Sequence, residues 1–497
     1  MLVDQLLTKQ EPLREAITMA YRRNETECVE SLLQALHFSP SALSQIQETA
    51  RKLLIETRAQ RKKQSGFDAL LQHYDLSSEE GIALLCLAEA LLRIPDQATQ
   101  DLLISDKISS VNWFNHLKTE NSLFSKATAW SLMLAGKIFS PTQEKEHSFL
   151  STLKKTLSHP GIAALRPLVM QGMKMLSTTF VLGSQIEEAL KNAQTAEALG
   201  YRFSYDMLGE AARTAEDAKR YFESYRQAIK AIGEAQKLHD PIQGAGLSIK
   251  LSALHPRYEY SKQAEVMKEL TPQLVELLQL AKKYNMGVTI DAEEADRLDL
   301  SLDIFESLFA SPELSSWEGL GIVVQAYQKR APFVIDWLAA LSKKYQKRIL
   351  LRLVKGAYWD SEIKQSQVLG LEAYPVFTRK HSTDLSYLVC AKKLLDQPSC
   401  FYAQFGTHNA QSIAAILEMA GSKNHFEFQC LHGMGRTLYD QIVDRAGYNI
   451  PTRIYAPVGK HQDLVGYLVR RLLENGANTS FISQLGNEQI PIEKVIA

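Results

Sequence analysis

The sequence is poor in cysteine and carries no excess of charge of either sign. Its 497 residues include only five cysteines, and 56 basic residues balance 56 acidic ones. The cysteines lie far apart without a C-x-x-C pair, so we expect no disulfide framework and a reducing compartment. Zero net charge argues against a general polyanion-binding protein. The cysteine positions are Cys28, Cys86, Cys390, Cys400 and Cys430.

Long hydrophobic runs are also missing. The longest apolar stretch, GIALLCLAEALL at 81–92, contains Glu89 and is shorter than the roughly 20 residues that a membrane-spanning helix needs. The N-terminus carries Asp4 and lacks the apolar core of a secretory signal. We therefore expect a soluble, cytoplasmic protein, and peripheral contact with the inner face of the cell membrane stays open.

Several motifs that carry chemistry are absent. There is no G-x-G-x-x-G dinucleotide turn after a strand, no phosphate-binding Walker loop and no G-x-S-x-G nucleophile elbow. Cys430 and His432 lie near His425 and His408 in the sequence, but their spacing matches no zinc motif. We predict no metal site.

The first 190 residues have a helical pattern. Asn24 is placed to cap a helix, with Glu27 as its reciprocal partner, and Ser77 and Glu80 repeat the arrangement. The basic stretch at 51–63 has no interleaved aromatic residues, so a solvated helix face is favoured over a nucleic-acid contact. We predict helical arm and linker segments over 1–190.

Beyond about residue 200, short β-rich runs alternate with long helical stretches. Eight such units favour a (βα)₈ barrel over 191–485, followed by a C-terminal tail at 486–497. An open doubly wound sheet also fits the alternation, but the missing glycine turn disfavours it. The predicted strands are 202–208, 247–254, 287–292, 321–327, 349–357, 399–406, 426–433 and 452–459.

Two cations lie within apolar strand runs of this predicted barrel. Lys250 is inside LSIKLSAL, and Arg352 is inside ILLRLVKGA. Burying either cation is costly unless it is paired, and the candidates for pairing are a ligand anion or nearby carboxylates. An ion network that only holds the barrel together remains the alternative. The carboxylates are Asp206, Glu210 and Asp291, and Asp291 could instead cap the following helix.

The last helical pattern, HQDLVGYLVRRLLENGAN, places four functional side chains on one face. Tyr467, Arg470, Arg471 and Glu474 fall within about 100° of arc at 100° per residue. Adjacent arginines hold a carboxylate well through forked hydrogen bonds. An exposed helix with an ordinary Arg470–Glu474 ion pair is the alternative.

Long segments of the chain resemble the proline dehydrogenase half of the bifunctional proline utilisation A flavoenzymes. The resemblance runs from about residue 20 to near the C-terminus and includes FSYDMLGEAARTAEDA, LSIKLSALHPRY, TIDAEEADRLDLSLDIF, RLVKGAYWDSEIK and YLVRRLLENGANTSF. It implies a distorted (βα)₈ barrel, preceded by a helical arm, with the final helix above the strand ends. It also implies FAD-dependent oxidation of L-proline to Δ1-pyrroline-5-carboxylate, with electrons passed to a membrane quinone.

The resemblance assigns roles to individual residues. Arg470, Arg471 and Lys250 would bind the proline carboxylate, and Asp291 would support them by orienting Lys250. Arg352 would lie against flavin N5. The pocket around the substrate ring would be formed by Leu431, Tyr455 and Tyr467. The residues around FAD would be Gln325, Val354, Lys355, Gly356, Ala357, Trp359, Thr407, His408, Glu474 and Ser480.

The chain departs from that family pattern at both ends. Family members continue into an aldehyde dehydrogenase module with its own NAD site, which we do not find before the chain stops at IPIEKVIA. Some members begin with a ribbon-helix-helix DNA-binding segment, for which no room exists before Glu11. We therefore expect no nucleic-acid partner. The rival functions are an aldolase or isomerase with Lys250 as a Schiff-base nucleophile, and a non-enzymatic helical scaffold.

Overall fold

The structure is a computed structural model that describes residues 11–61, 181–422, 425–444, 446–459 and 491–495, with single residues at 94, 96 and 99. The chain divides into two compact units. One unit comprises Met1–Lys62, Gln185–Val458 and Ile490–Ala497, and it contains nearly all of the described residues. The second comprises Lys63–Ser184 and Gly459–Gln489. The fold described below is that of the first unit.

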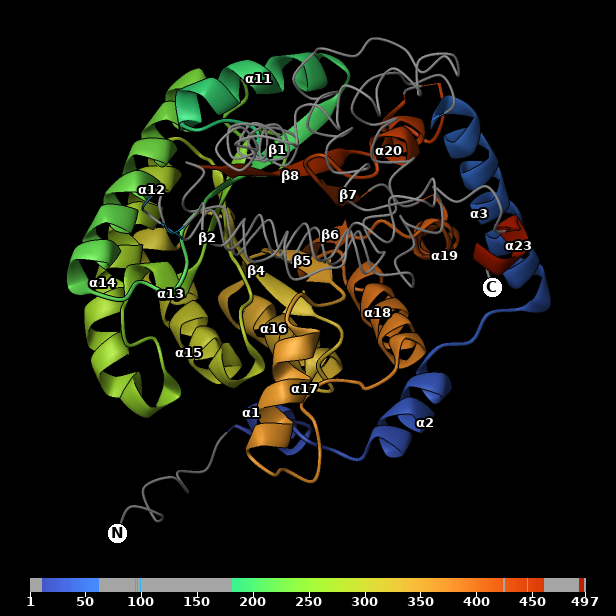
Figure 1. The fold of residues 1–497 in the computed structure, drawn as a ribbon, viewed down its shortest axis with the longest axis horizontal. Helices are drawn as coiled ribbons and strands as arrows, with labels where there is room; N and C mark the ends of the chain where they lie inside the picture. Colours follow the sequence, from blue (N-terminus) through green and yellow to red (C-terminus); the bar gives the residue numbers. More distant parts are fainter. Residues whose placement is uncertain are drawn as a thin grey trace, which may run out of the picture. The chain divides into compact units, whose positions relative to one another are not determined.

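Eight parallel strands close into a barrel in their sequence order (Figure 1). Closure occurs between the first and last strands, where Tyr201 pairs with Thr452 and Met207 with Val458. This confirms the predicted (βα)₈ fold. The strands are β1 Tyr201–Met207, β2 Gly246–Ile249, β3 Gly287–Ile290, β4 Leu320–Gln325, β5 Ile349–Val354, β6 Phe401–Gly406, β7 Phe426–Leu431 and β8 Thr452–Val458.

The second strand is shorter than the sequence pattern predicts. It ends at Ile249, and Leu251–Leu254 form the short helix α13, so Lys250 follows the strand instead of lying inside it. Side chains take over the backbone donors at this point. The Lys250 N–H donates to the Tyr225 hydroxyl at 3.1 Å, and the Ser252 N–H donates to Glu293 Oε1 at 3.0 Å. These bonds replace ladder bonds to a neighbouring strand.

Helices cover the outside of the barrel, and most of them bury an apolar face. In α14, Leu270, Leu274, Leu277 and Leu278 recur at helical spacing and are fully buried. Among the described helices, none is long and apolar enough to cross a membrane. The helices between and beside the strands are α11 Ile186–Ala198, α12 Ala215–Ala235, α14 Gln263–Lys283, α15 Leu298–Phe309, α16 Ala331–Tyr345, α17 Trp359–Val368, α18 Lys380–Leu395, α19 Ala410–Ala420 and α20 Arg436–Val443.

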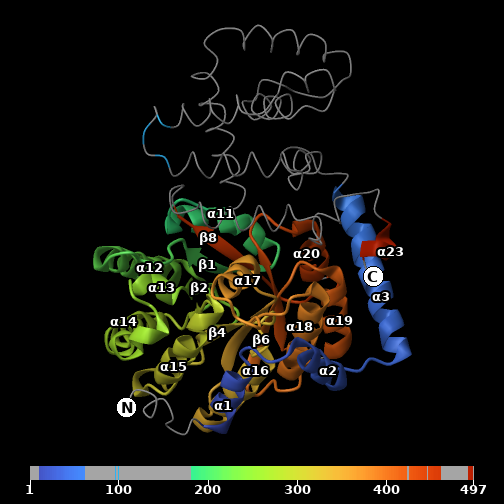
Figure 2. The same cartoon turned by 60° about the horizontal axis from the view of Figure 1, so that its bottom comes forward.

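The N-terminal helices run along the outside of this helical layer. Helix α1 (Pro12–Met19) packs on α16, α2 (Glu25–Ala35) on α18, and α3 (Pro40–Arg61) on α19 and α20, as Figure 2 shows. The short helix α23 (Ile492–Val495) contacts α3. These helices therefore enclose the barrel from α16 round to α20.

The predicted cap of α2 forms, but its reciprocal partner does not. The Asn24 side chain accepts hydrogen bonds from the Thr26 and Glu27 N–H groups, at 2.9 and 3.3 Å. The Glu27 carboxylate instead accepts a hydrogen bond from Arg23 Nε at 3.3 Å. A guanidinium four residues away offers a charged donor, which competes with the neutral backbone N–H of a capping box.

Candidate functional site

The inside of the barrel is lined by polar side chains at every second position of several strands. On β1 these are Arg202, Ser204 and Asp206, and on β7 they are Glu427 and Gln429. Since successive side chains of a strand point to opposite faces, each set shares one face. Their bonds to one another across the barrel show that this face is the inner one. A barrel of this kind usually fills its interior with branched apolar residues.

Lys250 lies at the carboxyl end of β2 and is held by carboxylates from two other strands. Its Nζ donates to both oxygens of Asp206, at 2.8 and 2.9 Å, and lies 3.4 Å from Asp291 Oδ2. Asp206 is fully buried. Burial disfavours the ammonium, but the two carboxylates outweigh burial, so the pKa of Lys250 lies well above its ordinary value. Lys250 is therefore a fixed cation.

Asp291 joins three neighbours at the end of β3. Its Oδ1 accepts from Arg352 Nη1 at 2.7 Å, and its Oδ2 accepts from the Tyr455 hydroxyl at 2.6 Å. Burial alone would raise the pKa of Asp291, but Lys250 and Arg352 outweigh it, so the pKa lies below its ordinary value. The alternative role as a helix cap does not apply, because the next helical turn begins at Ala295.

Arg352 lies inside the barrel on β5 and is gripped from several strands. Its Nε donates to Gln429 Oε1 at 2.6 Å, and its Nη2 donates to Ser204 and Ser248 Oγ at 3.2 and 3.0 Å. With the bond to Asp291, these partners among the described residues use four of the five N–H bonds of a guanidinium. The second N–H of Nη1 has no partner among the residues that the structure describes.

A second charged layer lies deeper in the barrel. Glu427 is fully buried and pairs with Arg453 through two bonds of 2.6 and 3.1 Å. Arg202 Nη1 approaches the same carboxylate at 3.3 Å. Burial would raise the pKa of Glu427, but the arginines lower it below its ordinary value. The ion network considered as an alternative for the buried cations thus exists, and it reaches from the strand ends to the barrel floor.

The predicted cofactor residues after β4 and β5 form a second group. Gln325 Nε2 donates to the Glu293 carbonyl at 2.8 Å, and its Oε1 accepts from the Ala357 N–H at 3.2 Å. Gly356 has a φ of +146°, and a Cβ there would meet the Tyr327 ring, so only glycine fits. Val354 is half-buried, whereas Gly356, Ala357 and Trp359 are exposed. This strand end offers open backbone and an aromatic ring.

Two predicted cofactor residues near β5 turn toward the helical layer. Lys355 forms an ion pair with Asp384 on α18, and Trp359 Nε1 donates to the Phe377 carbonyl at 2.9 Å. Burial lowers the pKa of Lys355, and Asp384 only partly offsets this effect. Neither residue has a bond to the Lys250–Arg352 group among the described contacts.

The ends of β6 and β7 bring three further predicted residues together. His408 Nε2 accepts from the Leu431 N–H at 3.2 Å, and Thr407 O accepts from the Tyr439 hydroxyl. Thr407 Oγ1 accepts from the Asn409 N–H at 3.2 Å. Burial raises the pKa of the neighbouring Cys430 thiol to about 12, so the reactive thiolate form is disfavoured.

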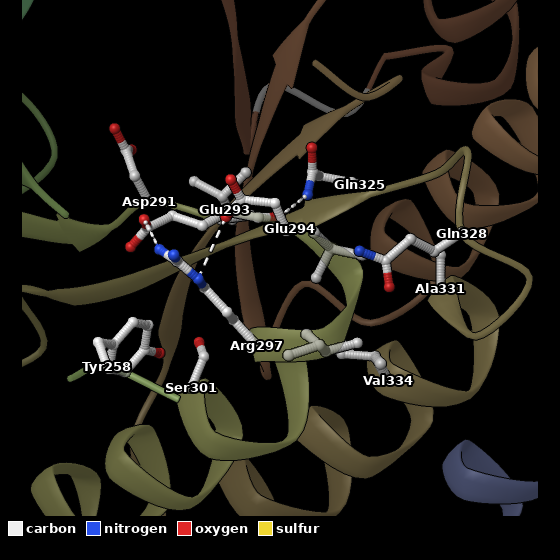
Figure 3. Close-up of a pocket in the computed structure, with 14 residues that line it drawn as sticks. Tyr258, Asp291, Glu293, Glu294, Arg297, Ser301, Gln325, Gln328, Ala331 and Val334 are labelled. Atoms are coloured by element: carbon white, nitrogen blue, oxygen red, sulfur yellow. Dashed lines mark hydrogen bonds and ion pairs between the residues drawn. The ribbon is translucent and has the colours of Figure 1, made fainter. Parts of the chain in front are cut away.

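A small cavity lies between the loop after β3 and helix α16 (Figure 3). Its volume of about 20 Å³ has room for about one water molecule. Glu293 lines the cavity, and its carboxylate accepts hydrogen bonds from Arg297 Nη1 at 2.7 Å and from the Ser252 N–H. Together with the bond from Gln325 to the Glu293 carbonyl, these contacts fix the loop that begins with Asp291.

Part of the predicted site lies outside the described residues. This part comprises Tyr467, Arg470, Arg471, Glu474 and Ser480. Conversely, sequence reasoning missed Ser204, Ser248 and Gln429, and it treated Asp206 only as a possible partner of Lys250. The signal that would have found them is the alternation of polar residues along β1, along β2 into Lys250, and along β7. Parallel strands covered on both faces are normally apolar throughout, so such alternation marks a polar interior.

Three protein families match consecutive parts of the chain. Residues 189–484 match the family described as "Proline dehydrogenase". Residues 11–57 match "Proline utilization A proline dehydrogenase N-terminal domain", and residues 66–180 match "DNA-binding domain of Proline dehydrogenase". The matches together span most of the sequence.

Similar proteins of known name and structure agree. The "Bifunctional protein PutA" of Escherichia coli (strain K12) is 51% identical over 97% of this chain, which spans 37% of that protein's length. "Proline dehydrogenase 1" of Bacillus subtilis (strain 168) is 30% identical over 63% of the chain and 90% of its own length. A crystal structure of Bradyrhizobium japonicum Proline Utilization A covers 96% of this chain and 47% of its own, with 44% identity and a TM-score of 0.72. A solved structure described as proline utilization A (PutA) "with proline bound in remote sites" covers 96% of this chain and 48% of its own, with 43% identity and a TM-score of 0.73.

The expectation of no nucleic-acid partner is contradicted by the match of residues 66–180 to a family described as a DNA-binding domain. That expectation used the overall charge and the space before Glu11, and neither describes a separate internal domain. The match to the dehydrogenase family covers more than half of the chain, and it contains all eight strands and the network around Lys250 and Arg352. On this basis the chain belongs to the proline dehydrogenase family, whose members are oxidoreductases.

Proposed function

We propose that this chain oxidises L-proline to Δ1-pyrroline-5-carboxylate with FAD as the hydride acceptor, and that the electrons then pass to a quinone. The observation that carries the proposal is the pair of fixed cations, Lys250 and Arg352, on either side of Asp291 at the strand ends. Active sites of such barrels lie at this face. The relatives named above are proline dehydrogenases or contain one.

The residues present fit a flavin. Arg352 keeps one N–H that its described protein partners do not use, which suits an electron-rich ring atom as acceptor. The strand end at Gly356 and Ala357 leaves backbone exposed beside Gln325. Helix α19 begins at Ala410, shortly after Thr407 and two residues after His408, and a helix N-terminus favours a phosphate group. We assign these residues to FAD, together with Val354, Lys355, Trp359, Glu474 and Ser480.

We assign proline to the side of Lys250. Its ammonium is fixed by Asp206 and supplies positive charge for the substrate carboxylate. The Tyr455 ring lies 6.0 Å from Lys250 Nζ and 5.0 Å from the Arg352 guanidinium, so it offers an aromatic wall to the pyrrolidine ring. Leu431 and Tyr467 complete this wall in our proposal, and Arg470 and Arg471 grip the carboxylate by forked hydrogen bonds.

Bound FAD would supply the hydride acceptor for oxidation of the ring carbon next to the proline nitrogen. The protein's own contribution is then alignment and electrostatics. Asp291 stays ionised because its pKa lies below the ordinary value, and it holds Arg352 and Tyr455 in one arrangement. A fixed guanidinium is an electrostatic stabiliser that needs no reorganisation during the reaction. A substrate held at its carboxylate also loses the freedom to rotate away.

The bonds of Lys250 disfavour the rival aldolase mechanism. A Schiff-base nucleophile must be a neutral amine, which requires a lowered pKa. Lys250 instead donates to both oxygens of a buried carboxylate, and its pKa is raised. In an aldolase, borohydride would reduce the Schiff base between Lys250 and a carbonyl substrate and so attach the substrate covalently. We expect no such attachment to this protein.

The direct test is anaerobic titration of the purified, FAD-loaded protein with L-proline. We expect the flavin absorbance to bleach and the product to be trapped by o-aminobenzaldehyde. A short-chain quinone should then restore the oxidised spectrum. A yellow protein that millimolar proline does not bleach would contradict the substrate, and a colourless protein that takes up no FAD would contradict the cofactor.

The variant Arg471→Met separates substrate binding from cofactor binding. Removing a charge-assisted partner of a buried carboxylate costs about 1.5–3 kcal/mol, so the KM for proline should rise by about one to two orders of magnitude. The FAD content should stay near that of the unmodified protein. If the variant purifies without flavin, Arg471 belongs to the cofactor site.

A further inference from the structure

We propose that Gln429 is a positioning residue that fixes the guanidinium plane of Arg352, and that Glu427 sets the orientation of the Gln429 amide. The inference rests on the proposed function of Arg352 beside the flavin. It concerns two buried residues of β7 that lie one layer below the strand ends.

The restraints on Arg352 are unevenly placed around the barrel. Ser204, Ser248 and Asp291 belong to the first three strands or the residue that follows them, and they bind the two Nη atoms. Nε has one described partner, Gln429 Oε1 on β7, at 2.6 Å. Gln429 therefore supplies the restraint from the opposite side. Without it, the guanidinium could rotate toward β1–β3 and still keep its other bonds.

An amide can present either its oxygen or its nitrogen, and the neighbours of Gln429 decide which. Its Nε2 lies 2.9 Å from Glu427 Oε1. An ionised carboxylate only accepts hydrogen bonds, so the NH₂ group must face Glu427 and the carbonyl must face Arg352. The reverse orientation would place NH₂ against the Nε–H and an oxygen against the carboxylate.

Glu427 is itself fixed by positive charge from the barrel floor. Arg453 binds it through two bonds, Arg202 lies 3.3 Å from Oε2, and the Tyr402 hydroxyl donates to Oε2 at 3.4 Å. Arg453 is anchored in turn by the carbonyl groups of Phe203 and Gly244, at 3.0 and 2.8 Å. The fixed carboxylate of Glu427 thus sets the orientation of the Gln429 amide, and the amide oxygen in turn fixes Arg352 Nε.

The structure contains a matched control for this chain of contacts. Gln404 Nε2 also donates to Glu427 Oε1, at 3.0 Å, and Gln404 and Gln429 are both 3% exposed. Gln404, unlike Gln429, has no bond to Arg352 among the described contacts. Replacing either amide by methionine removes the same bond to Glu427 at similar side-chain volume. Only Gln429→Met also removes the Arg352 acceptor.

The experiment compares Gln429→Met, Gln404→Met and Gln429→Glu, each loaded with FAD. In Gln429→Met we expect the rate of flavin reduction by proline to fall by about 10²-fold, the size expected for a misplaced catalytic group, with the KM for proline changed less than threefold. The midpoint potential of the bound flavin should shift as well, because the charge beside it has moved. Gln404→Met should also lose stability in urea, since it too loses a bond to Glu427, but it should keep the rate and the potential.

The variant Gln429→Glu tests the polarity itself. The new carboxyl group would lie against Glu427, and two adjacent carboxyls favour sharing one proton, which keeps a donor toward Glu427 and an acceptor toward Arg352. We expect it to restore most of the rate. Equal rates and potentials in Gln429→Met and Gln404→Met would overturn the inference. Failure of the unmodified protein to be reduced by proline would instead overturn the proposed function.

Discussion

The inner and outer faces of the barrel strands differ in chemistry. The outer face and the helices that cover it are packed with apolar side chains such as Leu277 and Ile232. The inner face carries a column of ion pairs from Arg202 at the floor to Lys250 at the strand ends. Apolar burial stabilises a fold without fixing a particular charge arrangement, whereas buried ion pairs are a weak source of stability. The comparison suggests that the outer layer holds the barrel closed and the inner column is kept for chemistry.

The largest effect should come from breaking the inner column at its top. In Lys250→Met the buried Asp206 loses its cation, and an uncompensated buried charge costs about 3–5 kcal/mol. We expect a loss of ~4 kcal/mol in the free energy of unfolding, measured in urea, together with weakened proline binding. The double variant Lys250→Met/Asp206→Asn should recover much of the stability but none of the binding. If the single variant binds proline normally, the inner column is structural only.

Removing a buried apolar side chain from the helices outside the barrel should lower stability without affecting the site. Leu277→Ala on α14 removes a fully buried side chain, which costs about 2–5 kcal/mol in transfer energy and cavity formation. We expect the free energy of unfolding, measured in urea, to fall by ~3 kcal/mol. The KM for proline and the flavin reduction rate of the folded protein should stay within twofold of the original. Leu277→Met, which keeps the volume, serves as the control. A large change in KM would show that the two layers are not independent.

The buried carboxyl group of Glu362 on helix α17 should give a pH dependence. Burial raises the pKa of Glu362 to about 6 from an ordinary value of 4.5. The folded state therefore binds the proton more tightly than the unfolded state, so stability falls as pH rises from about 4.5 to about 6 and is constant above. The difference corresponds to ~2 kcal/mol. Glu362→Gln keeps an acceptor for the Ala295 N–H, which lies 2.6 Å from Glu362 Oε1, and should be more stable than the original above pH 6. Equal stability of the two proteins across this range would contradict the raised pKa.

The smallest effect should be found farthest from the inner column. Asn24→Ala removes the cap of α2, which packs outside α18, and loss of such a cap costs about 1 kcal/mol. We expect the free energy of unfolding, measured in urea, to fall by ~1 kcal/mol or less, and the kinetics with proline to be unchanged. Asn24→Asp preserves the cap and should match the original protein. Altered kinetics in the alanine variant would indicate that the N-terminal helices influence the site.

The sequence predicted the charged residues at the strand ends more reliably than their partners inside the barrel. Lys250 and Arg352 stood out because each interrupts an apolar run, and Asp291 because it follows one. Their partners could not be assigned, since pairing across a closed barrel depends on strand register. Asp291 was expected to orient Lys250, yet its shorter bonds go to Tyr455 and Arg352, and Asp206 holds the lysine more closely.

Local side-chain chemistry accounts for the other differences. The β2 run was predicted to continue to residue 254, but Tyr225 and Glu293 satisfy the backbone donors at which it stops. Both residues lie far from this point in the sequence, so no local pattern reveals them. The apolar letters of Leu251–Leu254 are compatible with a strand or a buried helical turn.

The pairing of β1 with β8 determines when the barrel can close relative to the synthesis of the chain. Arg202 on the first strand meets Glu427 only after 225 further residues, and the two principal partners of the lower and upper layers, Arg453 and Tyr455, belong to the last strand. A nascent chain that ends before β8 would therefore lack Arg453, the partner that binds Glu427 through two bonds, and would have an unpaired edge on both β1 and β7. The barrel therefore closes only after the final strand has been synthesised, and until then the two open edges are available for non-native strand pairing.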